Sequence, residues 1–198
     1  TGLPVYLSTG LATYEDITRA IESIRAEEST ADIRLIHTVL QIPTPATMLN
    51  LNNVPALIEK YSIPIAYGQH SDIQDALLAA TALGAETVFV YVAEEMSPDL
   101  PDGPHAMLCS DAKALLTELT QVRVMMGGNE RTLSPEEEKK RISIRRSIVA
   151  AASIPKGEPI TEENIAFKRP GTGHAPWDLR VVLGSLAGKD YASGEDID

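Results

Sequence analysis

The sequence predicts an α/β protein in which a parallel sheet of about four β/α units precedes a small domain rich in strands and turns. Residues 1–127 alternate short β-branched apolar runs with longer segments whose apolar residues recur at helical spacing. The short runs are apolar enough to be covered on both faces, as parallel strands usually are. After Gly127-Gly128 the pattern changes to one charged helix followed by short strands and turns.

Four segments of the first part have the composition of buried strands. They are short, apolar and rich in Val and Ile, and each precedes a helical pattern. The expected strands are Pro4–Leu7, Ile33–Val39, Ile63–Tyr67 and Thr87–Val92.

The first two helices follow the first two strands. Thr13 is placed to cap a helix whose apolar stripe includes Ile17 and Ile21. Pro43-Thr44-Pro45 then interrupts the chain before a helix around Val54–Tyr61.

The third and fourth helices have clear boundaries or stripes. Ser71-Asp72-Ile73-Gln74 has the spacing of a capping box, and Gly84 is suited to end the helix that it opens. The apolar residues that mark the fourth helix are Leu115, Leu116, Leu119 and Val122.

The second part begins with a predicted linker helix over residues 129–146. Ser134-Pro135-Glu136-Glu137 combines an N-cap, a proline in the first turn and an N3 acid. The basic residues that follow suit a solvated helix face near the negative end of the helix dipole.

Residues 147–198 are expected to form a β-rich domain with a helical turn around Trp177–Leu183 and Trp177 in its local core. The expected domains are thus 1–128, 129–146 and 147–198.

Composition excludes several classes of function. With 198 residues, 43% of them hydrophobic, the chain can bury one substantial core or two small ones. A formal net charge of −11 argues against a nucleic-acid partner. The single cysteine, Cys109, excludes an internal disulfide and favours a reducing, cytoplasmic location. No apolar run approaches the roughly 18 residues that cross a bilayer, so no membrane partner is expected.

Several segments together resemble a known family. Pro4–Thr13, Pro43-Thr44-Pro45 and Leu49–Asn52 resemble signatures of the barrel of sialic acid (N-acetylneuraminate) synthases. Members of that family join a (β/α)8 TIM barrel to a carboxyl-terminal antifreeze-like domain, also called SAF, with a β-clip fold. The segments that match the SAF pattern are Arg145–Ala150, Ile154–Glu158, Ile160–Ile165, Lys168–Gly173 and Leu183-Gly184.

The resemblance implies that residues 1–128 are the carboxyl-terminal half of a TIM barrel. Four β/α units are half of a barrel that needs eight strands and about 250 residues. The chain is therefore expected to be a piece of a longer reading frame, or to be completed by another copy or another chain. Alone it is expected to be oligomeric or poorly soluble, because open strand edges and apolar faces promote association.

The resemblance also implies an activity. The family condenses phosphoenolpyruvate with an N-acylmannosamine-type amino sugar at the carboxyl ends of the strands. A divalent metal, Mn or Mg, polarises the sugar aldehyde; carbon 3 of phosphoenolpyruvate attacks it, water adds at carbon 2 and phosphate leaves. Members are homodimers in which the SAF domain reaches the partner barrel.

The resemblance supplies candidate site residues. Ser8, with Thr9, matches a phosphate-binding position, although a plain turn before the first helix is an alternative. His37 is a catalytic candidate and His70 matches a metal-binding histidine. Because both follow adjacent parallel strands, their rings are expected to point into one mouth. A hydrogen-bonded structural role is the alternative for either histidine.

Departures from the family pattern leave the metal site incomplete. Tyr91 replaces the second metal-binding histidine and Phe89 replaces an acid two residues earlier. Gly68-Gln69 replaces a serine-aspartate pair, and Leu40 replaces an asparagine. A rebuilt metal site from Glu94, Glu95 and His105 is one alternative, and a proline-rich turn over residues 99–105 is the other.

Arg169 is the best-preserved functional position. In the family this arginine contacts the N-acyl group of the sugar from the SAF domain of the dimer partner; the alternative is that it anchors the Pro170-Gly171 turn. Gly171 and Gly173 are expected to supply turn conformations. Two functions follow: a phosphoenolpyruvate-dependent synthase whose activity needs more than this chain, or a non-catalytic or truncated relative that binds a sugar or partner through the SAF domain.

Overall fold

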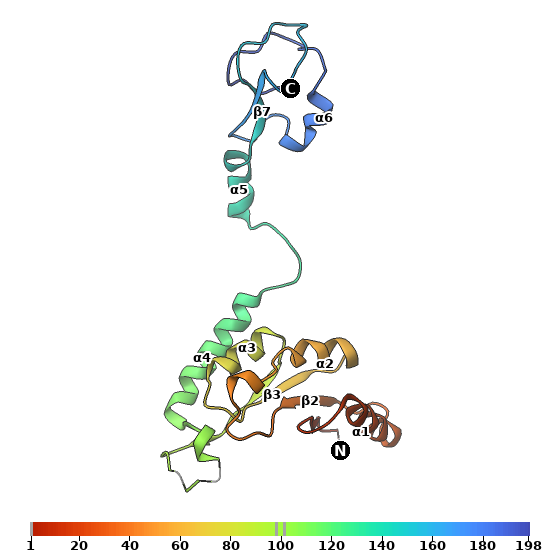
Figure 1. Cartoon of the computed structure of the whole chain (residues 1–198), viewed down its shortest axis with the longest axis vertical. Helices are drawn as coiled ribbons and strands as arrows, with labels where there is room; N and C mark the ends of the chain where they lie inside the picture. Colours follow the sequence, from red (N-terminus) through yellow and green to blue (C-terminus); the bar gives the residue numbers. More distant parts are fainter. Residues whose placement is uncertain (1, 98, 101) are drawn as a thin grey trace. The chain divides into compact units, whose positions relative to one another are not determined.

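The computed structural model describes residues 2–97, 99–100 and 102–198. The chain divides into two compact units, Thr1–Gly128 and Asn129–Asp198 (Figure 1). Position 101 of the proline-rich turn expected over residues 99–105 lies outside the described residues; within that stretch, Gly103–His105 forms a 3-10 turn. Among the described residues no helix is long and apolar enough to cross a membrane.

The first unit contains a four-stranded parallel sheet, which confirms the predicted α/β class. The strands lie in the order β1-β2-β3-β4. The last strand is shorter than the predicted Thr87–Val92, because after Phe89 the chain leaves this sheet. It pairs again at β5 (Val92–Ala93), in parallel with β6 (Met107–Leu108). The strands of the main sheet are β1 (Val5–Ser8), β2 (Ile33–Thr38), β3 (Ile65–Gly68) and β4 (Thr87–Phe89).

The helices of this unit follow the strands as predicted, with one boundary corrected. Thr13 caps α1 in a full capping box with Asp16. The expected capping box at Ser71 is absent: α3 begins at Asp75, and the fully buried Ser71 hydroxyl accepts only from the Ile73 N–H. The helices are α1 (Tyr14–Glu27), α2 (Asn53–Tyr61), α3 (Asp75–Ala82) and α4 (Cys109–Met126), with a 3-10 turn at Ala46–Met48.

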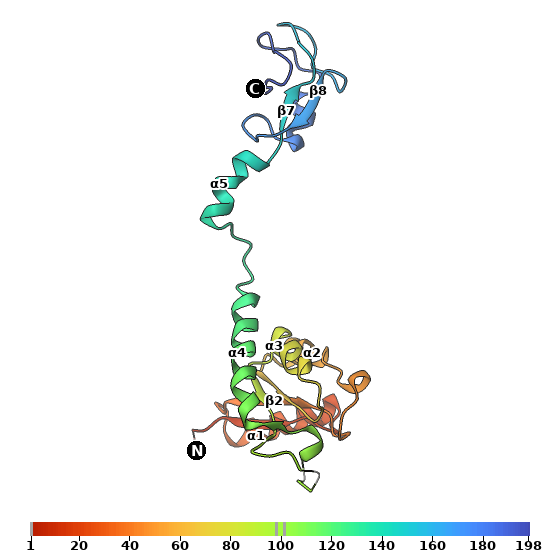
Figure 2. The ribbon, with the colours of Figure 1, turned by 90° about the vertical axis from the view of Figure 1, so that its left-hand side faces the viewer.

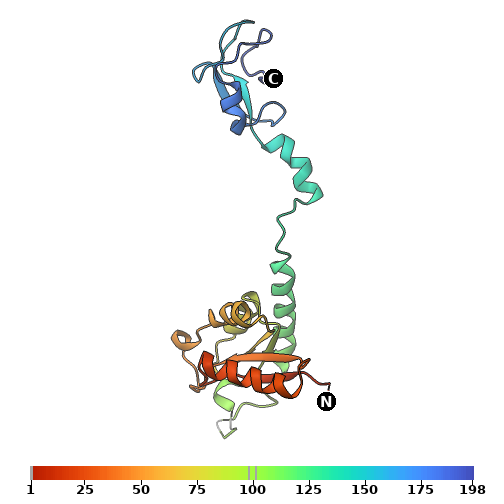
Figure 3. The ribbon, with the colours of Figure 1, turned by 90° about the vertical axis from the view of Figure 1, so that its right-hand side faces the viewer.

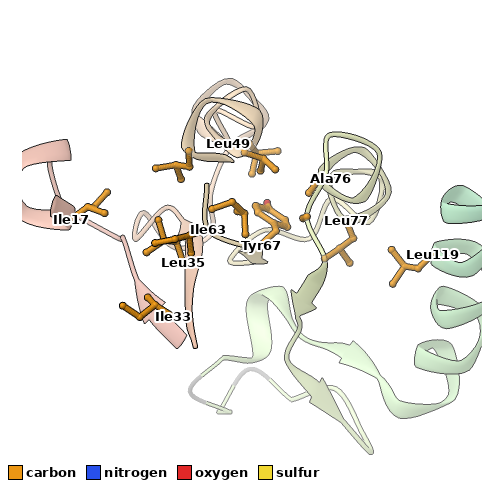
Figure 4. Close-up of a cluster of buried hydrophobic side chains, with 14 of the residues drawn as sticks. Ile17, Ile33, Leu35, Leu49, Ile63, Tyr67, Ala76, Leu77 and Leu119 are labelled. Atoms are coloured by element: carbon orange, nitrogen blue, oxygen red, sulfur yellow. The ribbon is translucent and has the colours of Figure 1, made fainter. Parts of the chain in front are cut away.

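The core lies between one face of the sheet and the helices. Leu35 and Ile65 of the strands belong to one buried cluster with Ile17 of α1 and Leu77 of α3. Figure 4 shows Leu119 of α4 pointing toward Leu77. Burying these apolar side chains is the main favourable contribution to this unit. Figure 2 shows α3 and α4 side by side.

The other face of the sheet carries a different set of residues. Side chains alternate between the two faces of a strand, so the register of the four strands fixes which positions share a face. We call this second face, opposite the helices, the open face. Its residues are Tyr6, Ser8, Arg34, Ile36, Thr38, Ala66, Gly68, Thr87 and Phe89.

The second unit consists of α5 (Pro135–Ile144) and a small β-rich body. Ser134 and Glu137 form the predicted capping box. In the β-rich body β7 (Ser147–Ala150) pairs antiparallel with β8 (Ile165–Lys168) (Figure 3). The core of this body includes Ile148, Ile154 and Tyr191. The predicted helical turn is present as a 3-10 turn at Pro176–Asp178 followed by α6 (Leu179–Val182).

Two expectations about this unit were wrong. Trp177 is not in the core: it is 65% exposed, and the Arg145 guanidinium lies 4.3 Å from its ring. Gly171 and Gly173 do not have left-handed backbone angles. They are required because the chain packs closely there: an added Cβ would lie 2.8 Å from Arg145 Cβ at Gly171, and 2.8 Å from Asp196 Cβ at Gly173.

Candidate active site at the carboxyl ends of the strands

Ser8 and Thr9 lie at the carboxyl end of β1 with different surroundings. Ser8 is exposed and shares the open face with Tyr6. Thr9 is buried, and its N–H and its hydroxyl both donate to the Ile36 carbonyl, at 3.0 and 2.9 Å. The donors of Thr9 therefore hold β1 to β2, whereas the Ser8 hydroxyl is accessible to a ligand.

His37 faces the helix side of the sheet. Its ring is buried, and Nε2 donates to the Leu49 carbonyl at 2.9 Å. Burial lowers the pKa of His37, which keeps the ring neutral. The ring lines a cavity of about 590 Å³ between α1 and α2, together with Thr9 and Asn53. The hydrogen bond to Leu49 is the contact expected for the structural alternative, and the catalytic role of His37 stays a prediction.

His70 lies two residues beyond the end of β3, in contact with the open face. Its Nδ1 is 2.9 Å from the Thr38 hydroxyl and 3.2 Å from the Val39 carbonyl, and its Nε2 is 3.0 Å from the Tyr91 hydroxyl. The Thr44 N–H donates to the His70 carbonyl at 2.7 Å, so the Pro-Thr-Pro segment fixes the backbone here. Since His37 and His70 contact opposite sides of the sheet, the expectation that they point into one mouth is wrong.

Tyr91 and His105 are brought together by the pairing of β5 with β6. Tyr91 immediately precedes β5, and His105 ends the 3-10 turn just before β6. The Met107 N–H donates to the Tyr91 carbonyl at 2.9 Å, and the two rings meet edge to face at 4.6 Å. Gly103 permits this tight loop, because a Cβ there would collide with the Ser97 carbonyl.

His105 is a neutral aromatic group packed behind Tyr91 and His70. Its side chain is fully buried, with its ring centroid 5.4 Å from that of His70. Burial and the nearby His70 lower the pKa of His105, and Asp102, 3.5 Å from its Nε2, opposes them only partly. Neither ring nitrogen has a hydrogen-bond partner among the described residues.

The side chains around His70 do not fit a divalent metal site. Mn²⁺ and Mg²⁺ favour carboxylate and other oxygen ligands, and soft or borderline ions favour several imidazoles or thiolates. Within the described ranges no three His, Cys, Asp or Glu residues are placed to hold an ion, which includes Glu94, Glu95 and His105. Both nitrogens of His70 already have partners, and the group facing Nε2 is a phenol.

Arg169 is exposed at the end of β8. Other residues hold the turn beside it: the Ser147 hydroxyl donates to the Pro170 carbonyl at 2.9 Å, and the Gly171 N–H donates to the Ile142 carbonyl at 2.7 Å. Thr172 is hydrogen-bonded to Asp196. Among the described contacts the Arg169 guanidinium takes part in none of the ion pairs.

The sequence analysis did not predict Thr38 as a site residue. It also did not predict that Tyr91 and His105 lie together. Thr38 was overlooked because β2 was predicted to place His37, its neighbour, at the site. The alternation of side chains along β2 is the signal that would have found it, since Thr38 and Gly68 are register partners on the open face.

Comparison with known proteins identifies the two parts of the chain. Residues 1–131 match the NeuB family, and residues 145–197 match the SAF domain. Among solved structures, the N-acetylneuraminic acid (sialic acid) synthetase of Leptospira borgpetersenii is 26% identical, with a TM-score of 0.66 over 70% of this chain and 48% of its own. The spore coat polysaccharide biosynthesis protein SpsE of Bacillus subtilis is also 26% identical, with a TM-score of 0.57 over 98% of this chain and 60% of its own.

Curated relatives extend the same result. An uncharacterized protein of Methanocaldococcus jannaschii is 32% identical over 92% of this chain and 54% of its own length. The N,N'-diacetyllegionaminic acid synthase of Campylobacter jejuni is 29% identical over 96% of this chain and 58% of its own length. The chain thus spans about half the length of the curated relatives it matches. With two thirds of its residues matched and its α/β fold shared with solved members, the chain belongs to the NeuB family.

Proposed function

We propose that this chain is the carboxyl-terminal portion of a synthase that condenses phosphoenolpyruvate with an N-acylmannosamine-type sugar to give a nonulosonic acid. The observation that carries the proposal is the gathering of polar side chains at the carboxyl ends of successive parallel strands, in a chain of the NeuB family. Ser8, Thr38, His70 and Tyr91 contribute from β1, β2, β3 and the segment after β4. In parallel barrels this end carries the chemistry.

The main sheet is proposed to be half of a closed barrel. The Tyr6 and Phe89 rings meet at 5.3 Å although β2 and β3 lie between their strands. Flat strands spaced about 4.8 Å apart would place β1 and β4 about 14 Å from each other. The contact across the small residues Ala66 and Gly68 supports a sheet that curls around the open face, as a barrel wall does around its interior.

The reaction needs a phosphate-binding group and a group that orients the sugar. The exposed Ser8 hydroxyl is proposed to bind the phosphate of phosphoenolpyruvate. Carbon 3 of that substrate then attacks the sugar aldehyde, water adds at carbon 2, and phosphate leaves with C–O cleavage. The described residues form no complete metal site, and each of these roles is proposed for side chains of the chain itself.

Arg169 is proposed to bind the N-acyl group of the sugar at the site of a partner subunit in a homodimer. Its guanidinium presents planar donors suited to a carbonyl oxygen. Its exposure supports this role, because among the described contacts its side chain takes part in none of the ion pairs.

Phosphate release is the test of this function. A longer protein that carries four further β/α units before Thr1 is expected to release phosphate when it is given phosphoenolpyruvate and N-acetylmannosamine. The 198-residue chain alone is not expected to do so. In the longer protein, Arg169→Ala is expected to raise the KM for the sugar about tenfold or more, with a smaller effect on kcat.

Arg180→Ala is the matched control, since Arg180 is another exposed arginine of the second unit. Equal effects of the two changes, or no phosphate release from the longer protein with any N-acylated amino sugar, would contradict the proposal.

A second candidate function is a non-catalytic relative that binds a sugar or a partner through its SAF domain. Both ring nitrogens of His70 already have hydrogen-bond partners, and residue 91 is a phenol. These contacts favour the non-catalytic candidate, because an enzyme that used a metal at this position would need side chains free to coordinate it. Sugar binding without phosphate release from the longer protein would support this candidate over the first.

A further inference from the structure

Three side chains from separate elements form a continuous hydrogen-bonded chain beside the open face. Thr38 ends β2, His70 follows β3, and Tyr91 precedes β5. The distances from the His70 ring are 2.9 Å to the Thr38 hydroxyl and 3.0 Å to the Tyr91 hydroxyl. Backbone hydrogen bonds hold all three residues, so their side chains are in place before a ligand binds.

The neighbours of His70 determine where its proton lies. The Val39 carbonyl, 3.2 Å from Nδ1, can only accept a hydrogen bond. Nδ1 therefore carries a proton, and in the neutral ring Nε2 is the acceptor for the Tyr91 O–H. The Tyr91 hydroxyl proton is committed to His70, and the remaining lone pairs of the Tyr91 oxygen are left to accept a hydrogen bond.

This arrangement opposes cation binding. The Nε2 lone pair, which a metal would need, is already used by Tyr91. His105 packs edge to face against both rings with its side chain fully buried, and Asp102, the acid beside it, has a side chain that is 45% exposed. The cluster therefore offers a hydroxyl, a phenol and imidazoles, and none of the carboxylates or thiolates that offset a divalent ion's loss of water.

We propose that the hydrogen-bonded Thr38, His70 and Tyr91 side chains occupy the position of a metal site and hold no divalent ion, and that the Tyr91 oxygen accepts a hydrogen bond from a hydroxyl group of the bound ligand. Tyr91 is the residue that touches the ligand, and His70 and His105 position it. That the ligand is a polyhydroxylated amino sugar rests on the proposed function; the hydrogen-bond arrangement and the lack of metal binding do not.

The first test needs no ligand or activity. In the ¹⁵N-labelled upstream-extended protein, which is expected to form one discrete species, long-range ¹H–¹⁵N correlation spectra are expected to show His70 protonated at Nδ1, and a His70→Gln variant identifies its signals. Calorimetric titration with Mn²⁺, Mg²⁺ and Zn²⁺ is expected to give no binding that His70→Gln abolishes. An Nε2-protonated His70, or a metal site that is lost in His70→Gln, would overturn the proposal.

The second test uses N-acetylmannosamine as the probe with the full chain and with its upstream-extended form. Tyr91→Phe keeps the ring and is expected to weaken sugar binding at least fivefold. Tyr6→Phe removes another phenol hydroxyl of the open face and is expected to change it less than twofold. Equal affinities for the Tyr91→Phe and unaltered chains would overturn the ligand contact.

The two proposals fail in different ways. If no form of the protein binds the sugar or releases phosphate, the proposed function fails, and the histidine spectra and metal titrations still decide between a hydrogen-bonded cluster and a metal site. If the extended protein is active only with an added metal that His70 binds, the proposed function stands and this inference fails.

Discussion

At the scale of single residues, the direction of a side chain decides its chemistry more than its identity does. His37 and His70 both follow neighbouring parallel strands. His37 donates to the Leu49 carbonyl on the helix side, whereas His70 binds Thr38 and Tyr91 beside the open face. Two residues of one type, close in the sheet, thus have separate roles.

Burial of His37 makes the stability of the first unit depend on pH. Because its pKa is lowered in the folded chain, the unfolded chain takes up a proton more readily as the pH falls below the ordinary value of 6.5. The neutral His37 ring therefore makes its full contribution to the free energy of unfolding above about pH 6.5, and this contribution decreases as the pH falls below 6.5.

His37→Gln is expected to reduce this decrease, since glutamine keeps a donor for the Leu49 carbonyl but does not titrate. Unfolding by denaturant, followed by circular dichroism at about pH 7.5 and about pH 5.5, measures the difference. His105, whose pKa is also lowered, leaves part of the dependence in place. The half-exposed His174 provides the control through His174→Gln; a larger effect there would contradict the assignment.

At the scale of elements, short loops between strands place the site. The β5–β6 pairing returns the chain to Tyr91, and the Pro-Thr-Pro segment holds the His70 backbone through Thr44. In the second unit the close approach at Gly171 and Gly173 joins the turn after β8 to Arg145 and Asp196. The close approaches in the second unit require glycine at positions 171 and 173. Adding one methyl group at such a position therefore tests whether close packing is the reason for the glycine.

Gly171→Ala is expected to destabilise the second unit by about 1–3 kcal/mol, because the new Cβ would lie 2.8 Å from Arg145 Cβ and the backbone would have to move. Trp177 fluorescence during denaturant unfolding reports on this unit. The matched control is Gly188→Ala, where a Cβ would meet no atom within 4 Å and the backbone is not left-handed. Similar losses for both variants would show that close packing is not the reason for Gly171.

At the scale of the whole molecule, the open face and the strand edges govern association. β1 and β4 are the edges of the main sheet, and Tyr6 and Phe89 on its open face are 37% and 40% exposed. Exposed edges and apolar patches are sites where chains pair. The chain spans about half of its curated relatives, which supports the proposal that other residues cover this face.

The 198-residue chain by itself is expected to self-associate or aggregate. Sedimentation velocity over a range of concentrations measures this, and a chain extended upstream of Thr1 by four β/α units serves as the comparison. The extended chain is expected to form one discrete species. A monodisperse, cooperatively melting monomer of the shorter chain would contradict the half-barrel proposal.

The sequence by itself determined the kinds and order of the elements, because strand and helix formation follow from local periodicity and caps. The four parallel strands, the Thr13 and Ser134 caps, and the helix end at Gly84 were predicted correctly for this reason. The likeness of both parts to the NeuB and SAF families was also contained in the sequence.

Only the tertiary structure decided which side chains meet. A shift of one residue along a strand reverses the face of every side chain, so the pairing register put Thr38 rather than His37 beside His70. Contacts between distant segments likewise ended β4 early, exposed Trp177 beside Arg145, and packed His105 behind Tyr91. Such contacts depend on long-range packing, which local patterns do not encode.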